Sequence, residues 1–108
     1  MAYFEHKKSD WKLFCERLPE WQEKYMERLI EEYIEYLQGD DPASTKFWEM
    51  EKRIRQDRRT PGVFLRLEKS NMDFDIICLI RDGVIGFGDL EGFSHELINR
   101  IEELNDAH

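Results

Sequence analysis

The segment from Glu20 to Gln38 presents more apolar surface than a helix packed on one side can bury. Pro19 suits the first turn of a helix and Gly39 suits its end, so the sequence predicts one helix over 20–38. At about 100° per residue, its large apolar side chains form two neighbouring stripes that together cover roughly 220°, about twice what one-sided packing needs. The first stripe contains Trp21, Tyr25, Leu29 and Tyr36, and the second contains Met26, Ile30, Tyr33 and Leu37, with Ile34 at its far edge. Both stripes must be buried, either by other helices of the chain or by a partner.

Capping and breaking residues predict further helices on both sides of this one. Before it, Ser9 caps a short helix over 10–18, which ends because the residue before Pro19 is driven out of the helical conformation. After it, Asp41 and Pro42 start a third helix. One side of that third helix carries Phe47, Trp48, Met50 and Ile54. A last helix over 95–105 is capped by Ser94.

Residues 63–87 are the part of the chain for which two structures compete. Thr60 and Ser70 are both capping residue types, Ser70 fits a capping box with Asp73, and Gly83 suits a helix end. These signals favour helices over 63–69 and 71–82. However, residues 63–68 nearly alternate in polarity and residues 74–80 are rich in β-branched side chains, so a small β-meander at 63–87 is the alternative.

Together these predictions give an all-α fold, a compact bundle of about five helices around a long central helix, with an α+β domain as the alternative. The 108 residues fit one domain over 1–108, in which residues 1–8 could form a disordered N-terminal tail. The longest unbroken apolar run, 76–80, is far shorter than the roughly 20 residues that a membrane span requires. No apolar signal core follows Met1, so we expect a soluble cytoplasmic protein.

Positive charge is concentrated in residues 46–69, which hold 8 basic and 4 acidic side chains in a chain of net charge −8. If this segment grips phosphates, the arginines that would do so are Arg53, Arg55, Arg58, Arg59 and Arg66. The acidic remainder of the chain opposes a nucleic-acid backbone unless it faces away. Alternatively, the basic helix packs antiparallel to the central helix and relieves the repulsion along Glu27, Glu31 and Glu35.

No motif for catalysis, metal binding or cofactor binding stands out. The three histidines are scattered, and Cys15 and Cys78 are 63 positions apart, which predicts two reduced, buried thiols. Cys78 with His95 is the one pair that could supply a nucleophile and a base, but His95 is expected at the surface behind its capping residue. Residues 82–89 are similar to half of a calcium loop and offer too few oxygen ligands. We therefore expect no enzymatic activity, no metal and no cofactor.

Three stretches carry a resemblance to a known group of proteins: residues 21–33, residues 46–54, and residues 82–85 with 89–94. They resemble small uncharacterised proteins carried by integrative and conjugative elements of gut Firmicutes. The resemblance covers residues 20–104 and implies a bacterial cytoplasmic accessory protein of a mobile element. It implies no catalytic residue, cofactor or partner.

The excess apolar surface makes a protein-interaction module the leading functional prediction. Tyrosine and tryptophan are enriched at interfaces because each combines a large apolar area with a polar group. The first stripe, with Trp21, Tyr25, Leu29 and Tyr36, is therefore the predicted partner-binding surface, and the partner is another protein or a second copy of the chain. A nucleic-acid-binding accessory protein that uses residues 46–69 is the alternative.

Overall fold

The computed structural model describes residues 4–107, which form four α-helices and no strand. In chain order these are α1 (Lys8–Leu37), α2 (Ala43–Asp57), α3 (Met72–Arg81) and α4 (His95–Asp106), with 3₁₀ turns at Lys69–Asn71 and Phe87–Leu90. The predicted all-α class is confirmed, and a β-meander at 63–87 is excluded. The helices expected over 71–82 and 95–105 are present within one residue at each end.

A single helix runs through Pro19, where two separate helices were expected. Proline inside a helix removes one backbone hydrogen bond and costs about 3 kcal/mol, yet α1 passes Pro19 without interruption. Phe14 and Leu18 before the proline and Trp21 after it are all buried in the same core. Because packing on both sides of Pro19 holds one continuous axis, the helices expected over 10–18 and 20–38 merge into α1, and residues 4–107 form four helices where about five were expected.

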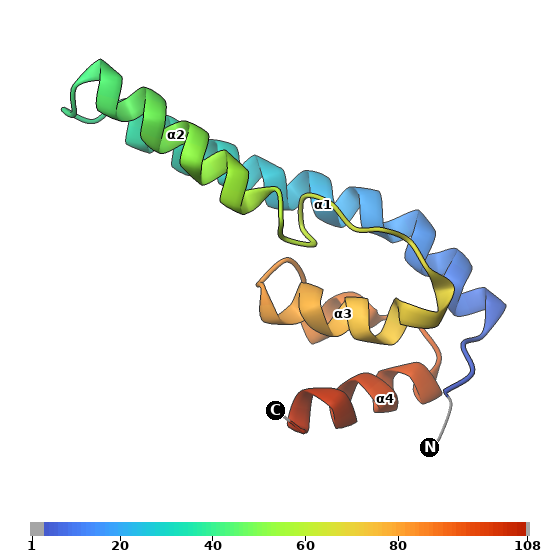
Figure 1. Cartoon of the computed structure of the whole chain (residues 1–108). Coiled ribbons are helices and arrows are strands. Elements are labelled where there is room, and N and C mark those ends of the chain that lie inside the picture. Colours follow the sequence, from blue (N-terminus) through green and yellow to red (C-terminus); the bar gives the residue numbers. More distant parts are fainter. Residues whose placement is uncertain (1–3, 108) are drawn as a thin grey trace.

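The hydrophobic core lies at one end of the molecule, where α3 and α4 pack together against the first half of α1 (Figure 1). We call residues 4–24 and 63–107 the core lobe. Its fully buried side chains come from all three helices and from the turn before α4: Phe14, Met72, Ile76, Leu79, Leu90, Leu97 and Ile101. The spacing of three or four residues within α3 and within α4 places the side chains of each helix on one stripe, as an amphipathic helix requires.

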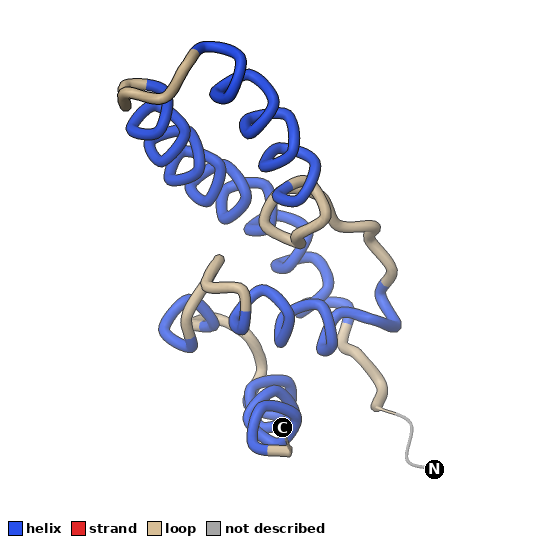
Figure 2. Tube along the Cα trace, turned by 60° about the vertical axis from the view of Figure 1, so that its left-hand side comes forward, coloured by secondary structure: helices blue, strands red, loops and turns tan. Residues whose placement is uncertain are grey.

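The second half of α1 and all of α2 form an antiparallel hairpin that projects from the core lobe (Figures 1 and 2). We call residues 25–58 the arm. The molecule measures 54 × 26 × 21 Å with a radius of gyration of 16.9 Å, whereas a compact domain of this length has about 13 Å. No residue of α2 is buried. The bundle is therefore elongated, and the expected compact shape is corrected, because the hairpin has no third layer against it.

Residues 63–68 form neither a helix nor a strand, so the helix expected over 63–69 is wrong. This segment connects the base of the arm to α3 along the side of α1 (Figure 1). Leu65 packs against the core, whereas Phe64 and Leu67 are exposed. An extended chain covers that distance with few residues, at about 3.3 Å each against 1.5 Å in a helix.

Two buried carboxylates tie the core lobe together. Asp10 accepts hydrogen bonds from the backbone N–H of Ser94 at 2.9 Å and from its hydroxyl at 2.6 Å. The Ser94 hydroxyl in turn accepts from the Leu97 N–H at 3.2 Å, which confirms the predicted N-cap of α4. Asp73 accepts from Arg100 Nε at 3.1 Å and lies 3.4 Å from His6 Nε2. Both carboxylates therefore link segments that are far apart in the sequence.

Three of the predicted N-caps are wrong, and part of the expected N-terminal tail is packed. Ser9 lies inside α1, which begins two residues before the predicted start, at Lys8, and α2 follows Pro42 with no capping bond from Asp41. No side-chain capping bond begins α3, so the capping box predicted for Ser70 and Asp73 is wrong, since Asp73 is engaged by Arg100 and His6 instead. His6 is buried and Phe4 is partly buried against the core, so this part of the expected 1–8 tail is packed. Residues 1–3 of that tail lie outside the described residues.

Candidate functional site

One side of the arm exposes a continuous set of large apolar side chains. Ile30, Ile34 and Leu37 follow the i, i+4, i+7 spacing of one stripe on α1 and are 53%, 49% and 44% exposed. On α2, Phe47 is 66% and Ile54 48% exposed. Leu37 shares a groove of about 470 Å³ with Phe47, Met50 and Ile54, so both helices contribute to the same side. We call these residues the apolar face: Ile30, Ile34, Leu37, Phe47, Met50 and Ile54.

Polar and aromatic contacts at the α1–α2 seam hold the two helices in this arrangement. The Tyr33 hydroxyl donates to Asp57, and Arg53 pairs with Glu32 while its guanidinium lies 5.1 Å from the centre of the Tyr33 ring. Burial and the hydrogen bond to Asp57 raise the pKa of Tyr33 to about 12, so the phenol stays protonated as a donor. Leu29 is buried in the same seam. The seam uses Leu29 of the first stripe and Tyr33 of the second, and it leaves Ile30, Ile34 and Leu37 of the second stripe exposed.

The apolar face points away from the core lobe. Ile30 follows Trp21 by nine residues, which is two and a half turns of helix and places the two side chains on opposite sides of α1. Trp21 is buried in the core. The other side of the arm is polar, with a smaller groove lined by Tyr36, Glu49, Lys52, Arg53, Gln56 and Asp57. Nothing in residues 4–107 covers the apolar face.

The predicted partner-binding stripe is largely used within the chain. Trp21 and Leu29 are 8% and 7% exposed, so neither offers a surface to a partner. Tyr25 is partly buried, with Gly62 directly against its ring, and the partly buried Tyr36 lies 3.4 Å from Asp41 through its hydroxyl. The structure thus brings this stripe together along α1 but covers it with the core lobe and the seam.

The exposed surface lies instead on the second stripe and on α2. The pattern of apolar residues identified both stripes, but it could not show which of them the chain itself covers. That choice depends on where α2 and the core lobe dock, which is a tertiary property. Phe47 and Ile54 carried a usable signal, because a helix with an apolar side and no buried residue must leave that side to solvent or to a partner.

Three of the five candidate phosphate-binding arginines are paired with carboxylates of the chain. Arg53 pairs with Glu32, Arg55 with Glu51, and Arg66 Nε lies 3.3 Å from Glu68. Each pair lowers the positive potential that a phosphate backbone would meet. The basic helix does pack antiparallel to α1, as one interpretation expected, but it reaches Glu32 and leaves the Glu27–Glu31–Glu35 row on the outer side.

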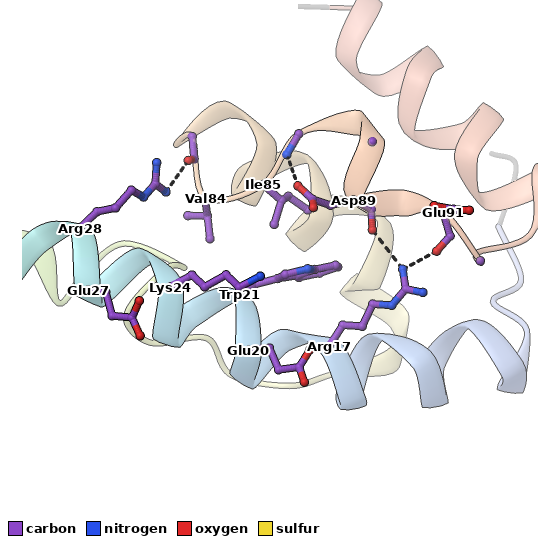
Figure 3. Close-up of a pocket in the computed structure, with 14 residues that line it drawn as sticks. Arg17, Glu20, Trp21, Lys24, Glu27, Arg28, Val84, Ile85, Asp89 and Glu91 are labelled. Carbon is purple, nitrogen blue, oxygen red and sulfur yellow. Dashed lines mark hydrogen bonds between the residues drawn. The ribbon is translucent and has the colours of Figure 1, made fainter.

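A cleft of about 1070 Å³ lies between α1 and residues 83–92 (Figure 3). Arg17 donates to the carbonyl oxygens of Asp89, at 3.1 Å, and Glu91, and Arg28 donates to that of Gly83 at 2.8 Å. Trp21 lies between α1 and the Val84–Ile85 side of the cleft (Figure 3). The two guanidinium groups therefore hold the loop of residues 83–91 against α1, so these arginines of the cleft stabilise the fold.

The two cysteines and His95 lie in different environments. Cys15 and Cys78 are free and only partly buried, where full burial was expected, and partial burial raises the pKa of both thiols. A raised pKa keeps a thiol protonated and unreactive. His95 is exposed, as predicted. Within residues 4–107, no three His, Cys, Asp or Glu side chains come together in a group that could hold a metal ion.

The chain was compared with protein families, curated proteins and solved structures. No family model matches the chain, and searches of curated proteins and of solved structures found no similar protein. None of the helices in the described range combines the length and apolar character needed to cross a membrane.

Proposed function

We propose that the protein is a non-enzymatic interaction module that binds a protein partner through the apolar face of the arm. One observation carries this proposal. Large apolar side chains on one side of the hairpin are 44–66% exposed, and no residue of its second helix, α2, is buried. A layer of two helices normally needs a second layer to bury its apolar side. The chain supplies no such layer within residues 4–107, so the face is free for a partner.

The exposed area of the apolar face is large enough to support its role as a binding surface. With about 200 Å² of full surface for a large apolar side chain, the exposed fractions of Ile30, Ile34, Leu37, Phe47 and Ile54 amount to about 500 Å². The largest apolar patch on a monomer is of this size and is commonly functional. Covering it offers about 12 kcal/mol at 25 cal/mol/Å², against association costs of about 4–15 kcal/mol. The balance allows a specific but moderate affinity.

The remaining surface supports a binding role more than a chemical one. In the cleft between α1 and residues 83–92, two arginines donate to backbone carbonyl groups, and the Asp89 carboxylate accepts from the Gly86 N–H at 2.8 Å. The resemblance of residues 21–33 and 46–54 to proteins of mobile elements falls on the two helices of the arm. A cytoplasmic accessory protein of a bacterial mobile element, acting through this arm, is the setting that we propose.

Photo-crosslinking in cells that express the full chain tests the proposal. A photoreactive phenylalanine analogue replaces Phe47 in one chain and Phe64, which is 70% exposed in the connecting segment, in the control. Irradiation is expected to give one discrete adduct from position 47, which Ile34→Glu abolishes, and none from position 64. The proposal is contradicted if both positions give the same diffuse products or if position 47 gives no adduct.

A further inference from the structure

We infer that the partner on the apolar face is a second copy of this chain, related by a two-fold axis that runs parallel to the arm. Each copy then places its α1 against α2 of the other, and the two hairpins form a four-helix bundle. This inference rests on the proposed function, because it requires the apolar face to be a binding surface. It adds the identity of the partner and the direction of packing.

The two edges of the apolar face carry opposite charge. Glu27, Glu31 and Glu35 line the edge on α1 that faces away from α2, and all three are exposed. On the α2 edge, the groove is bordered by Arg55, Arg58 and one acidic residue, Glu51, all exposed, so this edge is net basic. Among ion pairs between described residues, the three glutamates and Arg58 take no part, and Arg55 reaches only Glu51 on its own helix. The face is thus acidic along one side and basic along the other.

A two-fold axis parallel to the arm brings these opposite charges together. The Arg53–Glu32 pair fixes the register of the hairpin, so residues whose numbers sum to about 85 lie at the same height. Across the two-fold axis, Glu31 of one copy is level with Arg55 of the other, and Glu27 is level with Arg58. Glu35 is level with Glu51, whose charge is already paired with Arg55 of its own helix. In the same register Ile30 faces Ile54. An axis perpendicular to the arm would instead oppose α1 to α1 and place the glutamate rows against each other, which like-charge repulsion disfavours.

The area and the shape of the chain fit such a pair. Two apolar faces of about 500 Å² each bury about 1,000 Å² together, and the charged edges add to it, which reaches the lower range of specific interfaces. We therefore expect a dimer with a dissociation constant in the micromolar range. The core lobes do not interfere, since Trp21 and the lobe lie on the side of α1 opposite Ile30.

Sedimentation equilibrium of the purified full chain over a wide concentration range tests the inference. The mass is expected to rise from 13.1 kDa towards twice that value as concentration increases. Ile34→Glu combined with Phe47→Glu is expected to stay monomeric, and Phe64→Glu is expected to dimerise like the unsubstituted chain. Circular dichroism with thermal unfolding of the core lobe checks that each variant is folded. If the unsubstituted chain stays monomeric at every concentration, the inferred homodimer is contradicted.

A charge-reversal exchange tests the direction of packing. One variant carries Glu27→Lys and Glu31→Lys, and the other carries Arg55→Glu and Arg58→Glu. Each alone is expected to dimerise at least about tenfold more weakly, because like charges then meet along both edges. An equimolar mixture is expected to recover the affinity of the unsubstituted chain, because each α1 then meets a complementary α2. If the mixture does not recover, the axis parallel to the arm is wrong.

Failure here is distinguishable from failure of the proposed function. If the chain is monomeric in solution but position 47 still forms a discrete adduct whose mass is not that of two copies of the chain, the homodimer is contradicted and the apolar face remains a binding surface. If the chain is monomeric and position 47 forms no adduct, both the homodimer and the proposed binding function are contradicted.

Discussion

Replacing Asp10 with alanine is expected to destabilise the core lobe by about 3 kcal/mol. Asp10 is 4% exposed, and its two carboxylate oxygens accept from the N–H and the hydroxyl of Ser94 at 2.9 and 2.6 Å. A hydrogen bond to a charged group contributes about 1.5–3 kcal/mol. Two such bonds are lost in the variant, and water entering beside the half-buried Ser94 recovers part of the loss. Ser94 also caps α4, so the first turn of that helix loses its support.

The assay is urea unfolding followed by far-ultraviolet circular dichroism at one low protein concentration, because dimer formation would add a concentration-dependent contribution. Asp40→Ala, at the exposed tip of the arm, is the matched control and is expected to change stability by less than about 0.5 kcal/mol. Asp10→Asn keeps one acceptor oxygen and is expected to lie between the two. If Asp10→Ala and Asp40→Ala unfold within about 0.5 kcal/mol of each other, the contact between Asp10 and Ser94 does not hold the lobe together.

Further predictions concern the base of the arm, the partly buried carboxylate of Asp75 and the basic segment 46–69. Gly62→Ala is expected to cost about 1–3 kcal/mol in urea unfolding, because the new Cβ would lie 2.3 Å from the Tyr25 ring. Burial, with Asp73 and Glu68 nearby, raises the pKa of Asp75 to about 6, so ionisation penalises the fold as pH rises from about 4 through about 6. Asp75→Asn should therefore add about 1 kcal/mol at pH 7 and little at pH 4, and equal effects at both would contradict this. Fluorescence anisotropy with DNA and RNA at low salt should show only weak, salt-sensitive binding, because three arginines of residues 46–69 are paired; tight binding that survives added salt would refute it.

Local signals in the sequence placed the ends of α3 and α4 within one residue, but of the N-caps predicted at Ser9, Asp41, Ser70 and Ser94 only Ser94 makes a capping bond. Ser94 caps α4 and Gly83, with a φ of 74°, follows α3, as their residue types indicate. Pro19 misled the prediction, because buried side chains on both sides of it outweigh the local cost of proline in a helix. Residues 63–68 carried capping and alternation signals together, and the chain follows neither, since it has to span the distance from the arm to α3.

The sequence indicated excess apolar surface on α1 but not which part of that surface stays exposed. The excess apolar surface of α1 was evident from the spacing of its residues, and the structure leaves part of that excess uncovered. The aromatic stripe with Trp21 is the one the chain covers, whereas the aliphatic stripe with Ile30 and Ile34 stays open. Residue type alone favoured the aromatic stripe as an interface. The difference arises from the docking of α2 and the core lobe on α1, which no local pattern encodes.

Hydrogen–deuterium exchange at two protein concentrations tests most directly whether the arm presents a face that a partner must cover. In dilute solution the amides of 43–57 should exchange fastest among the four helices, because α2 buries no side chain. At high concentration the amides of 29–37 and 43–57 should become protected while those of α3 and α4 stay unchanged, and Ile34→Glu with Phe47→Glu should abolish the gain. Arm amides already as protected as those of α3 in dilute solution, with no response to concentration, would contradict the account.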